Sequence, residues 1–212
     1  MKLLTEEDKK YIEEAIKKAE AGTSGEIVFA AADSSARYHH ATLQGAIIGM
    51  ALVTAVFLLL PVNHNITKLL WTEFLSFAVF YAFLPYLPIR RWLISSKEMD
   101  ARVHDAALMQ FYSSGVHRTR EGNGVQIYLS FFEKRVVVLA DWGIHAKMGD
   151  KHWQEVRDLI IQGIKKGNVR DGICAAIEAC GKALAAHFPS RPDDINEIPD
   201  RVISRSLDQR AP

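Results

Sequence analysis

The chain opens with a polar segment in which apolar residues recur at helical spacing. Thr5 is a good N-cap, acids fill the first turn, and Ile12 and Ile16 lie on one stripe. Gly22 is a typical residue after a helix end. Residues 26–32 are then almost continuously apolar, which is typical of a strand covered on both faces. This opening predicts a helix followed by a central strand.

A much longer apolar pattern follows. Residues 41–62 contain no charged side chain and are long enough, as a helix, to cross about 30 Å of hydrocarbon. Residues 69–89 are also apolar and aromatic, apart from Glu73. We therefore expect transmembrane helices at 41–62 and 69–89, joined by a short loop. The alternative is a helical hairpin buried in a soluble protein.

Two features of this hairpin bear on its packing and function. Gly45 and Gly49 have the G-x-x-x-G spacing that lets another helix approach closely. Glu73 is expected one turn in from the helix start, where its carboxylate reaches the headgroup region. The other interpretation of Glu73 is a functional acid inside the membrane.

Basic residues predict the orientation of the hairpin. The connecting loop has only Lys68, whereas the outer flanks carry Arg37 on one side and Arg90, Arg91, Lys97 and Arg102 on the other. Positive charge concentrates on the cytoplasmic side, so both flanks are expected there. No signal peptide is expected, because residues 1–11 are a charged helix start. The predicted location is the cell inner membrane, with two spans.

Beyond the hairpin, the pattern is again that of a water-soluble domain. A helix is predicted from residue 95, with one apolar face made of Met99, Val103, Ala107 and Phe111. VQIYLSFF and RVVVLA then predict an antiparallel strand hairpin, which turns at Glu133 and Lys134. Two amphipathic helices follow, the first opening at Asp150 and the second ending near Phe188. Residues 190–212 are charged and proline-broken, which predicts a disordered tail.

The first strand has no partner in its own fragment, and a lone strand is not stable. Residues 1–36 and 95–189 should therefore form one domain, interrupted by the hairpin. The predicted fold is α/β, a three-layer-like sandwich in which a small mixed sheet has helices on both faces.

Composition narrows the classes of partner. The 26 basic and 25 acidic residues nearly balance, so no global field favours nucleic acid. Cys174 and Cys180 are six positions apart in one predicted helix, on different faces, and cannot bridge each other. Two buried, reduced thiols are expected.

Candidate chemistry gathers at strand ends. Asp33 follows the first strand, and Asp141 ends the third. If these strands are parallel neighbours, both carboxylates lie at one sheet edge, where they would suit Ca²⁺ or Mg²⁺. His145 is a possible third ligand or an ordinary solvated histidine, and Trp142 either packs or contacts the lipid interface. The simpler reading is that aspartates at these places serve as turn and cap residues.

Other motifs of catalysis are absent from the sequence. It has no H-E-x-x-H and no C-x-x-C, so no zinc frame is indicated. The G-x-G at residues 122–124 precedes a strand instead of opening a helix, which excludes a nucleotide fingerprint. There is no G-x-S-x-G elbow, and Ser34 and Ser35 have no identifiable base.

Three stretches carry a resemblance to a known family: SGEIVFAAADSS, GVQIYLSFFEKRVVVLADWGI and KKGNVRDGICAAIEACGKAL. With the order of elements, they resemble the TPM domain family, which includes plant thylakoid-lumen proteins of photosystem II repair and bacterial membrane-anchored proteins. The resemblance implies an α/β sandwich and, for some members, divalent-cation binding and weak phosphatase activity from acidic residues. Asp150 matches the family's acid before a helix, so Asp33, Asp141 and Asp150 form the candidate metal set.

The resulting expectation is a non-enzymatic module that binds a partner or a cation at the cytoplasmic membrane surface. Its expected partners are the lipid bilayer and another membrane protein, and the resemblance implies a role in membrane-protein assembly or upkeep. Two alternatives stay open. One is a metal-dependent phosphatase that uses the three aspartates, and the other is a transporter-associated subunit that uses Glu73.

Overall fold

The computed structural model describes residues 4–61, 65–145, 147, 150–191 and 196–205. The side chains of residues 145, 150–152 and 205 lie outside the described part. The chain divides into two compact units, one made of Met1–Ser35 with Asp100–Pro212 and the other of Ala36–Met99.

The first unit contains a mixed four-stranded sheet in the order β3-β2-β1-β4. Its strands are β1 (Glu26–Ala32), β2 (Gly124–Ser130), β3 (Arg135–Ala140) and β4 (Ile203–Arg205). β1 pairs in parallel with β2 and with β4, and β2 pairs antiparallel with β3. The predicted mixed sheet and its strand hairpin are therefore confirmed.

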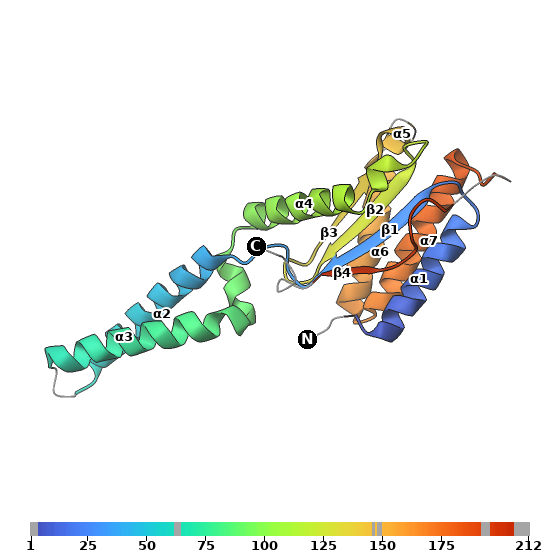
Figure 1. Cartoon of the computed structure of the whole chain (residues 1–212). Helices are drawn as coiled ribbons and strands as arrows, with labels where there is room; N and C mark the ends of the chain where they lie inside the picture. Colours follow the sequence, from blue (N-terminus) through green and yellow to red (C-terminus); the bar gives the residue numbers. More distant parts are fainter. Residues whose placement is uncertain (1–3, 62–64, 146, 148–149, 192–195, 206–212) are drawn as a thin grey trace. The chain divides into compact units, whose positions relative to one another are not determined.

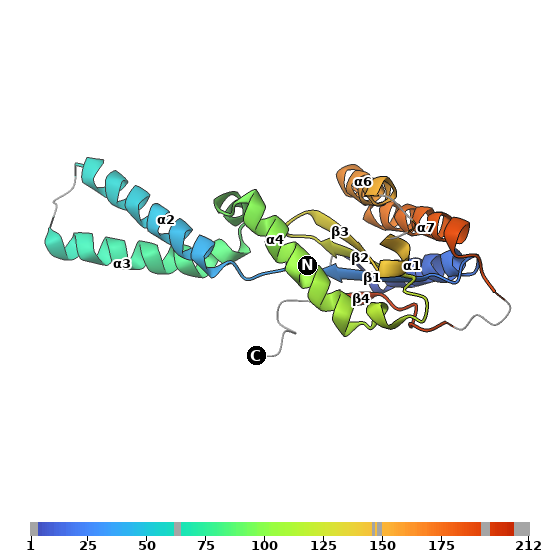
Figure 2. The same ribbon diagram turned by 90° about the horizontal axis from the view of Figure 1, so that it is seen from above.

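Helices cover both faces of this sheet (Figures 1 and 2). They are α1 (Glu6–Glu20), α4 (Ser96–Ser113), the 3₁₀ turn η3 (Val116–Arg118), α5 (Trp142–His145), α6 (Asp150–Lys166) and α7 (Val169–His187). Figure 2 shows α4 on one side of the sheet and α1, α6 and α7 on the other. This confirms the three-layer arrangement.

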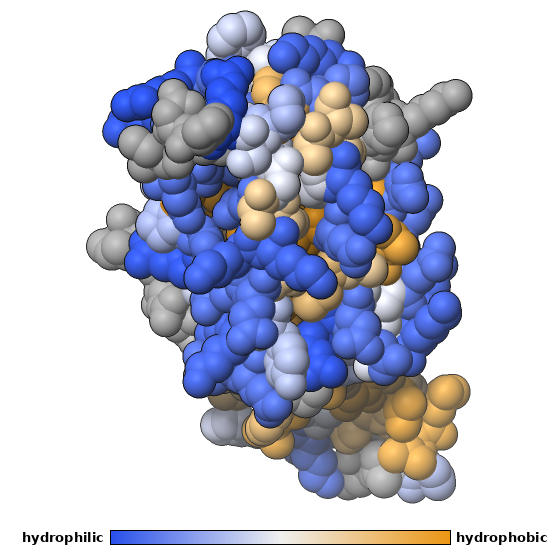
Figure 3. Space-filling view, turned by 90° about the vertical axis from the view of Figure 1, so that its right-hand side faces the viewer, coloured by the Kyte–Doolittle hydropathy of each residue, from blue (hydrophilic) through white to orange (hydrophobic). Residues whose placement is uncertain are grey.

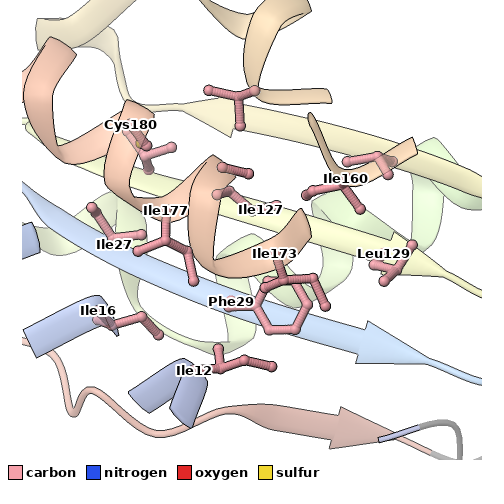
Figure 4. Close-up of a cluster of buried hydrophobic side chains, with 14 of the residues drawn as sticks. Ile12, Ile16, Ile27, Phe29, Ile127, Leu129, Ile160, Ile173, Ile177 and Cys180 are labelled. Carbon is pink, nitrogen blue, oxygen red and sulfur yellow. The ribbon is translucent and has the colours of Figure 1, made fainter. Parts of the chain in front are cut away.

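The larger core lies between the sheet and α1, α6 and α7 (Figure 4). Alternate residues of the parallel strands face it, including Ile27 and Phe29 of β1 and Ile127 of β2, and all three are almost completely buried. The intervening residues face α4, where Ala30 and Tyr128 pack on Val103 and Ala107. β1 is buried along its whole length, because both of its faces are covered.

The start of α1 is fixed locally. The Thr5 hydroxyl accepts a hydrogen bond from the Asp8 N–H, and the Asp8 carboxylate accepts one from the Thr5 N–H. This capping box satisfies two donors at the helix end and is worth about 1 kcal/mol. The predicted N-cap is therefore confirmed.

The expectation of disorder throughout residues 190–212 is wrong for the segment that forms β4. Residues Ile203 to Arg205 pair with Ala30 to Ala32, along the edge of β1 that β2 leaves open. Ile198 is also buried, in a small cluster with Val28 and Phe111. The charged residues and prolines of this segment predict disorder, although its few apolar residues complete the sheet.

The second unit is a helical hairpin. It contains α2 (His39–Leu59), α3 (Ile66–Phe83), and the 3₁₀ turns η1 (Leu84–Tyr86) and η2 (Pro88–Leu93). The spans long and apolar enough to cross a membrane are His39–Leu59 and Ile66–Tyr86, each of 21 residues. Both begin two to three residues before the predicted spans 41–62 and 69–89.

Candidate functional site

Asp33 and Asp141 lie at opposite ends of the sheet. Asp33 follows Ala32, which pairs with Ser130 at the end of β2. The Asp141 N–H donates to the carbonyl of Gly124, the first residue of β2, at 2.9 Å. Six residues of β2 separate these two positions, or about 20 Å at roughly 3.3 Å per residue. The two carboxylates therefore do not share a site.

The assumption behind the proposed cation site was that the first and third strands are parallel neighbours, and it is wrong. β1 and β3 lie on either side of β2, and β3 runs antiparallel to β2. The short connection of residues 131–134 forces this reversal, because two strands joined by a tight turn must run in opposite directions. The C-terminal ends of β1 and β3 accordingly point away from each other.

The other predicted ligands are only partly described. Asp150 begins α6 and His145 ends α5, but their side chains lie outside the described part of the chain. Among the described residues, no group of three or more His, Cys, Asp or Glu side chains is placed to hold a metal ion. The described residues therefore do not fit the divalent cation that the family resemblance implies.

Asp141 itself closes a turn. Its carboxylate accepts the Trp142 N–H at 2.7 Å, and its second oxygen is buried without a hydrogen-bond partner among the described residues. A Cβ on Gly143 would lie 2.5 Å from the Glu121 carbonyl oxygen, so the preceding loop packs directly on this turn. The ring of Trp142 contacts Gly122 but is 73% exposed. The segment is a strand end with a tightly packed turn.

A buried polar cluster that no sequence motif indicates lies at the opposite end of the sheet. The Glu133 side chain is fully buried and accepts hydrogen bonds from the Ser34 hydroxyl at 3.0 Å and the Ser35 N–H at 2.9 Å. Its other oxygen accepts the Ser130 hydroxyl. The Ser35 hydroxyl also donates to Ser130, at 2.9 Å, and lies 3.3 Å from the hydroxyl of Tyr128.

This cluster fixes the chain where the first unit leads into the hairpin. Ser35 is the last residue of the first unit's opening segment, and Ala36 begins the second unit. Ser34 and Ser35, for which no base was identified, do have a carboxylate beside them. Because Glu133 is fully buried, no substrate reaches it in this structure, and its role is to hold the end of β1 against the β2–β3 turn.

A second group of carboxylates binds the C-terminal segment. Glu13 accepts the Val202 N–H and Glu26 accepts the Glu197 N–H, each at 3.0 Å. Burial raises the pKa of Glu20 to about 8. A hydrogen bond from the Ile27 N–H opposes this rise in the pKa, while the charges of Glu26 and Asp200 add to it. Burial likewise raises the pKa of Glu26. Glu13 and Glu26 thus stabilise backbone amides of the segment that leads to β4, whereas Glu20 stabilises the amide of Ile27 in β1.

The two cysteines are free thiols, as predicted. Cys180 is fully buried, and burial raises its pKa to about 12. Cys174 is only half-buried, so the prediction of two buried thiols is wrong for this residue; burial is still the main cause that raises its pKa. Neither environment favours a reactive thiolate.

In the hairpin, the G-x-x-x-G spacing packs the two helices of the same chain. A Cβ on Gly49 would lie 2.6 Å from the Phe80 ring, and one on Gly45 would overlap Leu84. Gly45 and Gly49 are both buried on the inner side of α2. The glycine face is thus occupied within the hairpin.

Glu73 lies deeper along its helix than expected. α3 begins at Ile66, because the Asn65 side chain accepts the Thr67 N–H at 3.0 Å and caps the helix. Glu73 is therefore seven residues from the start, or about 10 Å at roughly 1.5 Å per residue, instead of one turn. Its side chain is half-buried, and its carbonyl accepts the hydroxyl of the buried Ser76 at 3.0 Å.

Fold and sites together define an α/β domain interrupted by an apolar helical hairpin, without a described metal cluster. Residues 93–183 match the family model of the TPM domain. This match over residues 93–183 confirms the resemblance found in the sequence. The match begins at Leu93, the last residue of η2, and ends within α7.

A solved structure shows the same fold. The NMR structure of the BA42 protein from the psychrophilic bacterium Bizionia argentinensis superposes with a TM-score of 0.60 and 24% sequence identity. The alignment covers 96% of this chain and 97% of that one. No curated protein matches the chain.

Proposed function

We propose that this chain is a membrane-anchored TPM-domain protein that binds a partner at the cytoplasmic surface of the inner membrane. The observation that carries the proposal is the outer surface of the hairpin. Large apolar side chains are exposed along both helices: Leu43, Ile47, Ile48, Leu52 and Val56 on α2, and Leu70, Trp71, Phe74, Leu75 and Val79 on α3. Such a surface is unfavourable in water and favourable in hydrocarbon.

The surface of the α/β domain has the opposite character. The face drawn in Figure 3 is largely hydrophilic over this domain, with only narrow apolar strips. Its apolar side chains are instead collected in the core between the sheet and α1, α6 and α7. A water-exposed domain joined to a lipid-exposed hairpin is the arrangement of an anchored module, with the bilayer as one partner.

Binding is favoured over catalysis by the separation of the acidic residues. A phosphatase that uses Asp33, Asp141 and Asp150 together needs carboxylates within a few ångströms of one ion. Asp33 and Asp141 lie about 20 Å apart along the sheet, at roughly 3.3 Å per residue. The proposed partner is another membrane protein, and a role in assembly or upkeep follows from the family resemblance.

Cysteine accessibility tests the anchoring and its orientation. In a Cys174→Ser background, Ile66→Cys places a thiol at the start of α3, in the predicted external loop, and Ser190→Cys places one after α7. A membrane-impermeant maleimide should label Ile66→Cys in intact cells, and Ser190→Cys only after the cells are opened. Equal labelling of both thiols, or recovery of the chain in the soluble fraction, would contradict the proposal.

An aryl-phosphate assay separates this proposal from the phosphatase alternative. The purified full chain should show no magnesium-dependent turnover above that of the Asp141→Asn variant. The phosphatase alternative would be favoured if Asp141→Asn abolished turnover while Asp158→Asn, an exposed control, retained it.

A further inference from the structure

The two edges of the sheet differ in how they are protected. β4 covers the outer edge of β1, whereas β3, at the other end of the sheet, pairs only with β2 among the described strands. β3 reads RVVVLA and contains no proline, and its one charged residue is Arg135. Open edge strands are usually blocked by prolines, bulges or several charges, because their unpaired amides attract other strands. β3 has none of these along its apolar part.

The register identifies the backbone groups that are turned outward. Asp141 donates to Gly124, so this pair is a hydrogen-bonded pair of the antiparallel ladder. Hydrogen-bonded pairs alternate along the ladder, so the N–H and C=O groups of Leu139 and Val137 also point toward β2. The N–H and C=O groups of Val136, Val138 and Ala140 therefore point away from β2, toward the open edge.

A basic groove runs beside the start of this edge. Its volume is about 540 Å³, and it is lined by residues of α4, β3 and α6 that include His104, Arg135 and Arg157. Arg135 pairs with Asp100 at 2.5 Å. Within the described residues, Arg157 takes part in no ion pair. The groove thus presents more positive than negative charge next to outward-facing amides.

We propose that the β3 edge accepts an extended peptide segment of a partner protein, which adds a fifth strand to the sheet and places an acidic side chain in the groove of Arg135 and Arg157. Backbone hydrogen bonds supply affinity in such strand addition, and the side-chain groove supplies specificity. A second copy of β3 fits less well, because its single charged side chain is another arginine. This inference rests on the proposed partner-binding function and names its surface.

Amide hydrogen exchange of the full chain in lipid nanodiscs tests the inference. The probe is a blocked peptide, acetyl-TVTVTEE-amide, at millimolar concentration, with acetyl-TVTVTKK-amide as the charge control. The acidic peptide should slow exchange of the Val136, Val138 and Ala140 amides about tenfold or more, whereas the lysine peptide should not. The Val137 and Leu139 amides, already bonded to β2, should change little.

Two variants separate the backbone and charge contributions. Val138→Pro removes an outward N–H without removing a bond to β2, so it should abolish protection by the peptide while the fold persists. Arg157→Glu should weaken peptide binding about tenfold at low salt. Lys165→Glu, an exposed substitution on the same helix, is the matched control. If Val138→Pro does not fold, the Arg157→Glu comparison still decides the question.

Each other outcome overturns the inference. One such outcome is no protection by either peptide, and another is equal protection by both. A third is protection of the outward amides without peptide that increases with the concentration of the protein, which would identify a second copy as the occupant. Loss of membrane association in the cysteine experiment, with peptide protection retained, would instead refute the anchoring and leave the β3 edge intact.

Discussion

The two units of this chain use similar apolar side chains in opposite ways. Ile177 of α7 is completely buried in the core of the α/β domain, whereas Ile48 of α2 is 51% exposed. Both are isoleucines on long helices, so composition does not distinguish them. What differs is how far each side chain is buried, and substitutions at these two positions should show the consequence for stability.

The largest expected effect is in the core. Ile177→Ala should lower the free energy of unfolding of the α/β domain by about 4 kcal/mol, because it leaves a cavity. Ile48→Ala should cost less than about 1 kcal/mol. Urea-dependent labelling of Cys180, which is fully buried in the α/β domain, measures the effect of each substitution on the stability of that domain, in the full chain with Cys174→Ser. Equal losses would mean that Ile48 contributes to the stability of the α/β domain as much as a core residue does.

A charge in the hairpin gives the next effect. Leu52→Arg places a cation near the middle of α2, where insertion into a membrane costs about 3 kcal/mol. The membrane-inserted fraction should therefore fall, as measured by carbonate extraction of membranes. Met109→Arg, at an exposed position of α4, is the control and should leave insertion unchanged. Unchanged insertion of Leu52→Arg would argue against a lipid-facing α2.

The buried carboxylate at the end of β1 should show a smaller effect. Glu133→Gln keeps the size of the side chain but places an NH₂ group opposite hydroxyl and amide donors, with an expected cost of about 2 kcal/mol. Glu155→Gln, at an exposed position of α6, should be neutral. The same Cys180 labelling reports both variants. A neutral Glu133→Gln would show that the cluster does not hold the end of β1.

The smallest effect depends on pH. The pKa of Glu20 is raised to about 8, so the folded state binds this proton more tightly than the unfolded state. Its stabilising contribution is complete below the ordinary glutamate pKa and is lost as the pH rises through about 8. Stability should fall by about 1 kcal/mol between pH 7 and pH 8. Glu20→Gln should flatten this profile, whereas Glu14→Gln should not.

Much of the fold followed from periodicity, because each element carries its own signal. The stripe of Ile12 and Ile16 and the cap at Thr5 predicted α1, and the Glu133-Lys134 turn predicted the β2–β3 hairpin. The strand order did not follow, since β1 meets β2 only after the whole hairpin has intervened. The cation site depended on that order, and the true positions of Asp33 and Asp141 removed it.

The features that the sequence missed depend on long-range contacts. Glu133 reads as an ordinary turn residue, and only its approach to Ser34 and Ser35 makes it a buried acceptor. β4 is three residues long, too short for a periodic signal, and it forms because β1 has an open edge. Glu13 and Glu26 accept hydrogen bonds from backbone amides far away in the sequence, and no sequence motif indicates such contacts.

The pairing of β1 with β2 also sets the order of events during synthesis. Glu26 pairs with Gly124, so the ribosome must complete the hairpin before β1 can find its first partner. Under the proposed anchoring, a translocon therefore receives α2 and α3 while β1 is still an unpaired apolar segment. Membrane insertion then precedes domain folding, and β4, from the last part of the chain, completes the sheet. A delay in insertion would prolong the time for which β1 is open to aggregation.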